Sequence, residues 1–189
     1  MIIVGVGAGA GMLTEEGISR IRAAKLIYGS DRALELARGY AASDAMLVPI
    51  TDYTALRGLP EDAVVLSTGD PLMAGLGYLP GEVVPGISSM QAAFARLKVS
   101  WTNVAVVNAH GKDHTSAIAR AAADVRAGHS VFVIADPDFS VAALAAALPP
   151  ETRVAVCEDL GYPSERVAEG TAEHPPAVQS RLFCVVAGY

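Results

Sequence analysis

The stretch VGVGAGAGMLT, residues 4–14, lies at the end of an apolar run that begins at Ile2. Its four glycines are Gly5, Gly7, Gly9 and Gly11. Glycine allows positive φ angles and a close approach of the backbone to a ligand, as a chain leaving a strand needs. Thr14 is a suitable N-cap, and the carboxylates of Glu15 and Glu16 favour a helix that begins there. The stretch therefore predicts a strand, a glycine-rich loop and a helix.

This loop also matches a dinucleotide-binding pattern. Gly5, Gly7 and Ala10 satisfy the relaxed G-x-G-x-x-A fingerprint, which requires a helix N-terminus at the glycines to receive a pyrophosphate. The expected helix begins only after Thr14, and its first carboxylates would repel a diphosphate. A nicotinamide oxidoreductase is therefore disfavoured. A turn that only joins strand to helix and a ligand-binding loop stay equal alternatives for this segment.

The rest of the chain alternates short apolar runs with segments of helical period, which predicts an α/β fold with mainly parallel sheets and crossover helices. In the first half we expect helices at 15–24, 32–41 and 90–97, and strands at 2–5, 26–28, 46–49, 64–67 and 82–84. After the polar break at 100–103 we expect helices at 116–127 and 141–148, and strands at 104–108, 131–135, 153–158 and 182–187. The sequence thus predicts two α/β domains, 1–101 and 102–189, that pack closely around a cleft.

The composition excludes several classes of protein. Of the 189 residues 52% are hydrophobic, enough for a globular core, but no run approaches the roughly 20 apolar residues of a membrane-spanning helix. A net charge of −6 without a Lys/Arg cluster argues against nucleic acid as a partner. Cys157 and Cys184 lie in apolar runs and are expected to be packed thiols. The chain opens on a strand-like segment rather than a secretory signal, so we expect a cytoplasmic protein.

Two further segments combine a strand end with polar residues. In STGDPLMAGLG, residues 67–77, Asp70 could hold a ribose hydroxyl or an ammonium group, or it could cap a helix with Pro71 at the first position. In VVPGISSMQAAFARL, residues 83–97, Ser88 and Ser89 could cap a helix or contact a small polar ligand.

The segment AHGKDH, residues 109–114, follows another expected strand. His110 and His114 stand four apart, but Gly111 interrupts the helix that a metal-binding pair would need and no third ligand is in register, so we expect no metal. The loop is either a plain polar connection or a place where His110 and Lys112 contact an acidic substrate. Motifs for acyl transfer and nucleotide hydrolysis are absent from the sequence.

Four of these segments, taken in order, resemble the tetrapyrrole methylase family: VGVGAGAGMLT, STGDPLMAG, VVPGISSMQAA and AVCEDLGYPSERVAEGT. The resemblance extends over nearly the whole chain. IYGSDRALELA, VNAHGKD and VIADPDFSVAALA are similar to the branch that methylates C5 of cobalt-precorrin-7 in cobalamin synthesis, and to the corresponding half of the fused precorrin-6Y methylase.

The resemblance implies two α/β domains, a homodimer, and S-adenosylmethionine bound in the cleft, with S-adenosylhomocysteine as product. It implies cofactor contacts at Ala8, Thr68, Gly69, Asp70, Met73, Ser88, Ser89, Ile134 and Gly161. The acceptor would be an anionic corrinoid, with Arg32, His110 and Lys112 as candidate carboxylate partners, together with Arg57 and Arg96. Asp70 and His110 are candidate bases by residue type. A separate C15-methyltransferase/decarboxylase is an expected partner.

The sequence departs from the family in two places. Family members usually carry Pro where Ala8 stands, and the link between GDPLMAGLG and VVPG is reduced to YLPGE. These departures motivate one alternative, a homologue that binds the cofactor without turnover. The other alternative is a different activity of the same family. The protein would then methylate another precorrin carbon, or the modified histidine of elongation factor two as diphthine synthase does.

Overall fold

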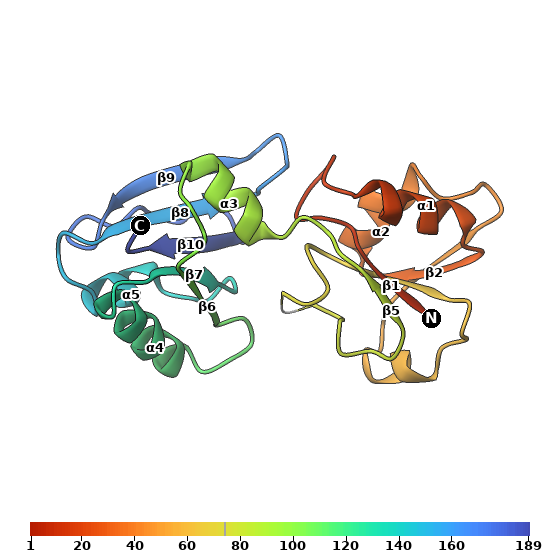
Figure 1. Cartoon of the computed structure of the whole chain (residues 1–189), viewed down its shortest axis with the longest axis horizontal. Coiled ribbons are helices and arrows are strands. Elements are labelled where there is room, and N and C mark those ends of the chain that lie inside the picture. Colours follow the sequence, from red (N-terminus) through yellow and green to blue (C-terminus); the bar gives the residue numbers. More distant parts are fainter. Residues whose placement is uncertain (74) are drawn as a thin grey trace. The chain divides into compact units, whose positions relative to one another are not determined.

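The computed structural model describes residues 1–73 and 75–189; Ala74, in the expected 67–77 loop, lies outside the described residues. The chain divides into two compact units, Met1–Ser89 and Met90–Tyr189 (Figure 1). Each unit has a sheet with helices, so the predicted pair of α/β domains is confirmed. The units divide twelve residues before the expected 101/102 boundary. Helix α3 (Ser89–Leu97) packs with the second unit, where the Phe94 ring lies 6.5 Å from that of Phe132.

The first sheet has the strand order β3-β2-β4-β1-β5, and its strand pairs are all parallel, as predicted. The strands are β1 (Ile2–Gly5), β2 (Leu26–Gly29), β3 (Met46–Pro49), β4 (Val64–Ser67) and β5 (Glu82–Val84). The helices are α1 (Glu15–Ala23), α2 (Asp31–Arg38) and the short 3₁₀ helix η1 (Thr54–Gly58). Parallel order brings the carboxyl ends of β1, β4 and β5 to one edge of the sheet.

Successive side chains of the strands in the first sheet point to opposite faces and belong to two apolar layers, one on each face. Val4 and Leu66 pack with α1 and α2 on one face, whereas Ile3 and Val65 pack with η1 on the other. The same division is visible in Figure 1, where α1 and α2 lie on one side of the strands. The connections that follow β1 and β4 run in opposite directions across the sheet. This reversal makes a topological switch point at the carboxyl ends of β1 and β4.

The second sheet has the order β6-β7-β10-β8-β9, and only β6 and β7 are parallel. Its strands are β6 (Val104–Asn108), β7 (Ser130–Ile134), β8 (Arg153–Glu158), β9 (Arg166–Thr171) and β10 (Phe183–Ala187). Its further helices are α4 (His114–Arg126) and α5 (Val141–Ala146). The expectation of a mainly parallel sheet is thus wrong for this unit.

The error has two sources, namely β10, which pairs antiparallel with both β7 and β8, and the unpredicted edge strand β9. Its sequence RVAEGT carries two charged residues and a glycine and lies at the sheet edge, so its apolar pattern is too weak to indicate a strand. It pairs with β8 through a tight reversal in which Asp159 and Gly161 have φ angles of 48° and 80°. A short reversal of this kind can only join antiparallel neighbours.

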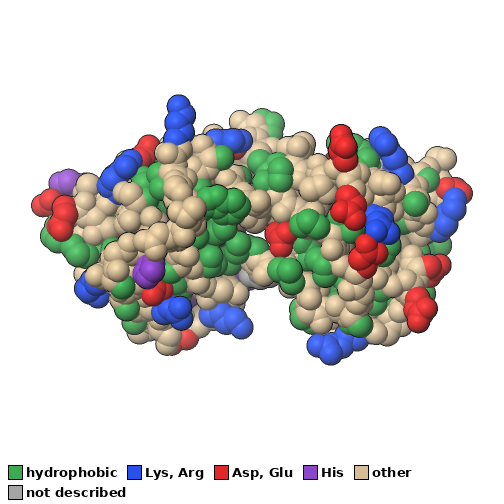
Figure 2. All heavy atoms as spheres, viewed as in Figure 1, with side chains coloured by type: hydrophobic (Ala, Val, Ile, Leu, Met, Phe, Trp, Pro, Cys, Tyr) green, Lys and Arg blue, Asp and Glu red, His purple; other side chains and the backbone are tan. Residues whose placement is uncertain are grey.

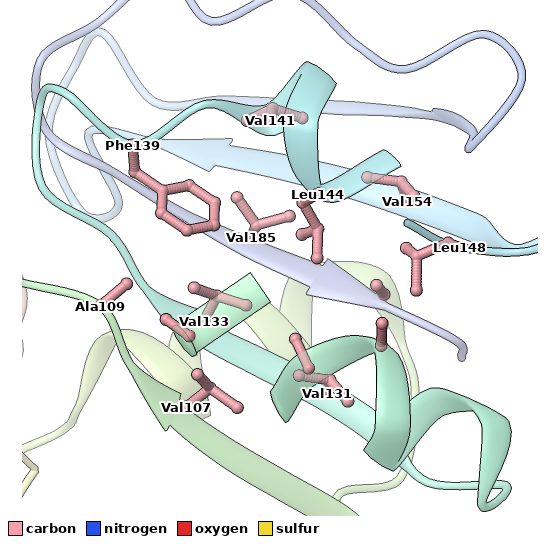
Figure 3. Packing of buried hydrophobic residues seen from close by; sticks show 14 of the residues in the cluster. Val107, Ala109, Val131, Val133, Phe139, Val141, Leu144, Leu148, Val154 and Val185 are labelled. Atoms are coloured by element: carbon pink, nitrogen blue, oxygen red, sulfur yellow. The ribbon is translucent and has the colours of Figure 1, made fainter. Parts of the chain in front are cut away.

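A second core lies between this sheet and helices α4 and α5. Val107, Val133 and Val185 from the strands meet Leu144 and Phe139 (Figure 3). Cys157 and Cys184 are buried free thiols on paired strands, which confirms that they are packed rather than bridged.

The distribution of charged side chains and the lengths of the helices can be compared with what the composition predicted. On the face seen in Figure 2, Lys and Arg side chains are spread among Asp and Glu on each unit. The longest helix in the described residues, α4, has 13 residues, and none there has the length and apolar character to cross a bilayer.

Candidate functional site

Three loops meet at the carboxyl edge of the first sheet. Gly7 and Gly69 exchange two backbone hydrogen bonds, with N···O distances of 3.2 and 2.8 Å. The N–H of Ala8 donates to the carbonyl of Ile87 at 2.9 Å. The loops that follow β1, β4 and β5 therefore form one hydrogen-bonded unit, which we call the three-loop junction.

Glycines make this junction possible. A Cβ on Gly5 would lie 2.5 Å from the nitrogen of Gly86, and a Cβ on Gly86 would lie 2.4 Å from the carbonyl oxygen of Gly69. Gly7 and Gly69 have φ angles of 82° and 69°. Backbone packing thus accounts for these glycines.

The first helix begins well after the glycines. Thr14 caps it, because its hydroxyl accepts a hydrogen bond from the N–H of Gly17 at 3.1 Å, and Glu15 is the first helical residue. A pyrophosphate site would need this helix to begin at the glycines. The helix begins after Thr14 instead, which confirms the prediction from the sequence.

Asp70 joins two loops of the junction. Its Oδ1 accepts a hydrogen bond from the N–H of Leu72 at 2.8 Å, and its Oδ2 accepts one from the N–H of Gly86 at 3.2 Å. The helix that the capping alternative requires does not begin here, because residues 71–73 form a turn. Both carboxylate oxygens are therefore engaged in holding backbone.

Space remains open beside the junction. A Cβ on Gly69 would meet only the Cα of Ser88, at 3.9 Å, and the side chain of Leu72 is 74% exposed. The half-buried Thr68 and Met73 lie on the same edge. Backbone groups, a hydroxyl and apolar surface at a switch point suit a ligand with both nucleoside and amino-acid parts. The residues present thus fit S-adenosylmethionine.

The second unit has its own pair of loops, at the carboxyl ends of the parallel strands β6 and β7. Oδ2 of Asp136 accepts a hydrogen bond from the N–H of Gly111 at 3.0 Å and lies 3.0 Å from Nε2 of His114. Together with the N–H of Asp138, these contacts lower the pKa of Asp136 to about 2. The carboxylate of Asp136 therefore fastens the loop that carries His110 and Lys112 to the end of β7.

His110 points its Nδ1 at the carbonyl oxygen of Ala135, 3.4 Å away. A carbonyl oxygen can only accept, so Nδ1 of the neutral ring carries the hydrogen and Nε2 is left as an acceptor. The structure thus brings His110, Lys112 and Ile134 to one edge of the second sheet. The two histidines have separate partners, and the described residues hold no cluster of three potential metal ligands.

We expect Asp136→Asn to destabilise the second unit by about 1–2 kcal/mol, because charge-assisted hydrogen bonds to Gly111 and His114 are weakened. The pKa of Asp136 is lowered on folding, so this contribution is present above its usual pKa of 3.8 and is lost as pH falls towards 2. Urea titrations of both proteins at several pH values would measure it. Curves separated by the same free energy at pH 7 and at pH 2 would contradict the assignment.

Gly161 and Arg96 meet through a residue that the sequence did not indicate. Oε2 of Glu165 accepts the N–H of Gly161 at 2.7 Å, and the guanidinium of Arg96 donates to both carboxylate oxygens at 2.5 and 3.2 Å. Arg96 is thus occupied, contrary to its expected role as a substrate cation. The two side chains are 69 positions apart, so no local pattern could reveal the pair.

The other expected cations lie in different places. Arg57 is exposed on η1 and stacks over the ring of Tyr78 at 5.6 Å, and Arg32 is half-buried in the first turn of α2. Both belong to the first unit, whereas Lys112 is exposed on the second.

Comparison with known proteins gives consistent results. The model of the tetrapyrrole (corrin/porphyrin) methylases matches residues 1–176. A precorrin-6Y C(5,15)-methyltransferase [decarboxylating] of Mycobacterium tuberculosis is 31% identical over 210 residues, covering 100% of this chain and 52% of that protein. A probable cobalt-precorrin-7 C(5)-methyltransferase of Methanocaldococcus jannaschii is 26% identical, covering 88% of this chain and 86% of its own length. The chain therefore spans about half the length of the M. tuberculosis relative.

A solved structure is similar over both units. The precorrin-6Y methylase of Archaeoglobus fulgidus superposes with a TM-score of 0.72 at 32% identity, covering 98% of this chain and 96% of that one. The family model therefore matches most of the chain, and this solved structure has the same fold over nearly all of it. The chain belongs to the tetrapyrrole (corrin/porphyrin) methylase family.

Proposed function

We propose that the protein is an S-adenosylmethionine-dependent C-methyltransferase that acts on a corrin precursor and methylates C5 of cobalt-precorrin-7 in cobalamin biosynthesis. The three-loop junction carries the proposal, because it joins the loops that follow β1, β4 and β5 at a switch point and leaves space beside Gly69. The names of the M. tuberculosis and M. jannaschii relatives support the acceptor.

The cofactor contacts follow from the positions of the family motifs. In the first unit they are Ala8, Thr68, Gly69, Asp70, Met73, Ser88 and Ser89, and in the second unit Ile134 and Gly161. The cofactor supplies the methyl group from its sulfonium. The residues of this chain hold donor and acceptor in line and exclude water, which is how most of the rate is gained without a protein nucleophile.

His110 is the better of the two candidate bases. Both carboxylate oxygens of Asp70 hold backbone N–H groups, whereas His110 is exposed and keeps Nε2 as an acceptor. We therefore assign Asp70 to positioning the loops and His110 to removing the proton from the methylated carbon. Lys112 and Arg32 would meet carboxylates of the substrate.

The departure at Ala8 does not leave the loop loose. Its N–H bonds the carbonyl of Ile87, a contact that proline cannot make because it has no N–H. The short link is also accommodated, since Leu79 is buried in the core and Gly81 packs against the carbonyl of Met1. These contacts give no support to the alternative that the departures suggested, a homologue that binds the cofactor without turnover.

S-adenosylhomocysteine is expected to bind the purified protein and to raise its melting temperature. At a concentration one hundred times Kd the stabilisation is about 2.7 kcal/mol, provided that only the folded state binds. Calorimetry would measure Kd, and NADH would serve as the control nucleotide. Absence of binding to folded protein would contradict the proposal, and so would preferential binding of NADH.

Assembly and location extend the proposal. We propose a cytoplasmic homodimer that works with a C15-methyltransferase/decarboxylase, since the M. tuberculosis relative is named a decarboxylating C(5,15)-methyltransferase. Sedimentation of the pure protein would test the dimer. Methylation assays with other precorrins and with elongation factor two would test the acceptor.

A further inference from the structure

Tyr162 has a buried hydroxyl without a hydrogen-bond partner. It is the one buried side-chain nitrogen or oxygen of which this is true in residues 1–73 and 75–189. Buried polar atoms are nearly always paired because an unpaired one has lost its water without compensation. An exception of this kind therefore calls for an explanation.

The backbone around Tyr162 is firmly held. Its N–H donates to the carbonyl of Asp159 and its carbonyl accepts from the N–H of Glu165, both at 2.9 Å. The neighbouring Gly161 donates to the carboxylate of Glu165, which in turn binds Arg96 of helix α3. The hydrogen bond from Arg96 lowers the pKa of Glu165, which keeps the carboxylate ionised. The unpaired hydroxyl is therefore not the result of a loose turn.

The place of Tyr162 in the chain points to a ligand. It directly follows Gly161, at the turn between β8 and β9, and belongs to the DLGYPSER motif. A phenolic hydroxyl both donates and accepts, so it can pair with a hydroxyl, a carboxylate or a ring nitrogen. S-adenosylmethionine carries all three kinds of group.

We propose that the hydroxyl of Tyr162 hydrogen-bonds the bound cofactor, and that Glu165 and Arg96 position the turn that presents it. The proposal rests on the proposed function and adds a contact to it. It implies that the free protein bears the cost of an unpaired hydroxyl and that cofactor binding removes this cost.

Tyr162→Phe is the direct test, since it deletes only the hydroxyl. In the free protein the melting temperature should stay the same or rise, because no hydrogen bond is lost. The affinity for S-adenosylhomocysteine should fall by about fivefold to tenfold, the equivalent of one neutral hydrogen bond. Loss of a purely structural contact would lower the melting temperature of the free protein, whereas here only the affinity for S-adenosylhomocysteine should fall.

Tyr189→Phe is the matched control. The hydroxyl of Tyr189 already has a partner in the same unit, Glu169 at 3.0 Å. Its removal should lower the melting temperature of the free protein and leave the affinity for S-adenosylhomocysteine unchanged.

Calorimetric titrations and thermal melts of the wild type and both variants separate the outcomes. An unchanged affinity in Tyr162→Phe, with a wild type that binds, overturns this inference alone. A melting temperature that falls as far as in Tyr189→Phe also overturns it, because the hydroxyl would then have a partner in the free protein. A wild type that does not bind S-adenosylhomocysteine overturns both this inference and the proposed function.

Discussion

Gly86→Ala is expected to destabilise the first unit by about 3 kcal/mol and to abolish binding of S-adenosylhomocysteine. The added Cβ would lie 2.4 Å from the carbonyl oxygen of Gly69 and 2.7 Å from the carbonyl carbon of Gly5. Both neighbours are backbone atoms, so no change of rotamer can relieve the overlap. The loops must move apart, which also breaks the hydrogen bond between Asp70 and the N–H of residue 86.

Gly39→Ala is the control for that substitution. Gly39 follows α2 with a φ angle of −67°, and a Cβ there would meet no atom within 4 Å. The free energy of unfolding of Gly39→Ala should stay within about 0.5 kcal/mol of the wild-type value or rise slightly. Urea denaturation and calorimetry would measure both variants. Equal stabilities and equal affinities in the two variants would show that the junction is not closely packed.

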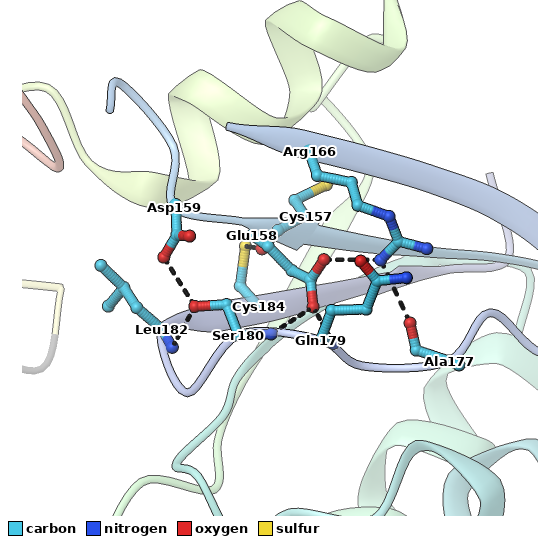
Figure 4. Close-up of polar contacts among 9 residues, drawn as sticks. All are labelled: Cys157, Glu158, Asp159, Arg166, Ala177, Gln179, Ser180, Leu182 and Cys184. Carbon is cyan, nitrogen blue, oxygen red and sulfur yellow. Dashed lines mark hydrogen bonds and ion pairs between the residues drawn. The ribbon is translucent and has the colours of Figure 1, made fainter. Parts of the chain in front are cut away.

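Glu158→Leu is expected to destabilise the second unit by about 3 kcal/mol, because it removes one partner of a buried charge cluster. The side chain of Glu158 is 1% exposed and accepts hydrogen bonds from Arg166 and from the N–H groups of Gln179 and Ser180 (Figure 4). The cluster holds the segment before β10 against the end of β8. Its loss leaves three donors without their acceptor.

Glu169→Leu offers a matched comparison on the neighbouring strand. Its ion pair with Arg153 is about half exposed, so its loss should cost only about 0–1 kcal/mol. Chemical denaturation of both variants would measure the difference. Similar costs for the two substitutions would contradict the role given to burial.

The pH dependence of the Glu158 contribution follows from its pKa. Burial alone would raise this pKa, but the hydrogen bonds from Gln179, Ser180 and Arg166 outweigh burial and lower it. A lowered pKa in the folded state gives stability that is present above the usual value of 4.5 and is lost as pH falls through the folded value. As the pH falls below 4.5, the free energy of unfolding of the wild type should therefore decrease more than that of Glu158→Leu.

The sequence predicted the elements of the first unit closely because its signals are local. Thr14 caps the helix that it was expected to precede, and the buried strand β4 is a continuous apolar run. The order of the parallel strands, however, depends on packing between distant segments. It was the family resemblance, and not periodicity, that placed the loops after β1, β4 and β5 in one site.

The residues that the sequence did not reveal depend on long-range contacts. Glu165 acquires its role only when α3 brings Arg96 to it, and Tyr162 is notable only because its hydroxyl is buried. The edge strand β9 has no apolar alternation to indicate it. Conversely, Ala8 looked like a weakness in the sequence, yet its N–H provides a hydrogen bond that the usual proline would lack.

The most direct test of the proposed function is transfer of a labelled methyl group from S-adenosylmethionine to cobalt-precorrin-7 by the purified protein, with the product analysed by NMR and mass spectrometry. The account predicts the gain of one methyl group, located at C5, and a much slower reaction with His110→Ala. A protein that binds S-adenosylhomocysteine but transfers no methyl group to this acceptor, or transfers it to another carbon, would contradict the account.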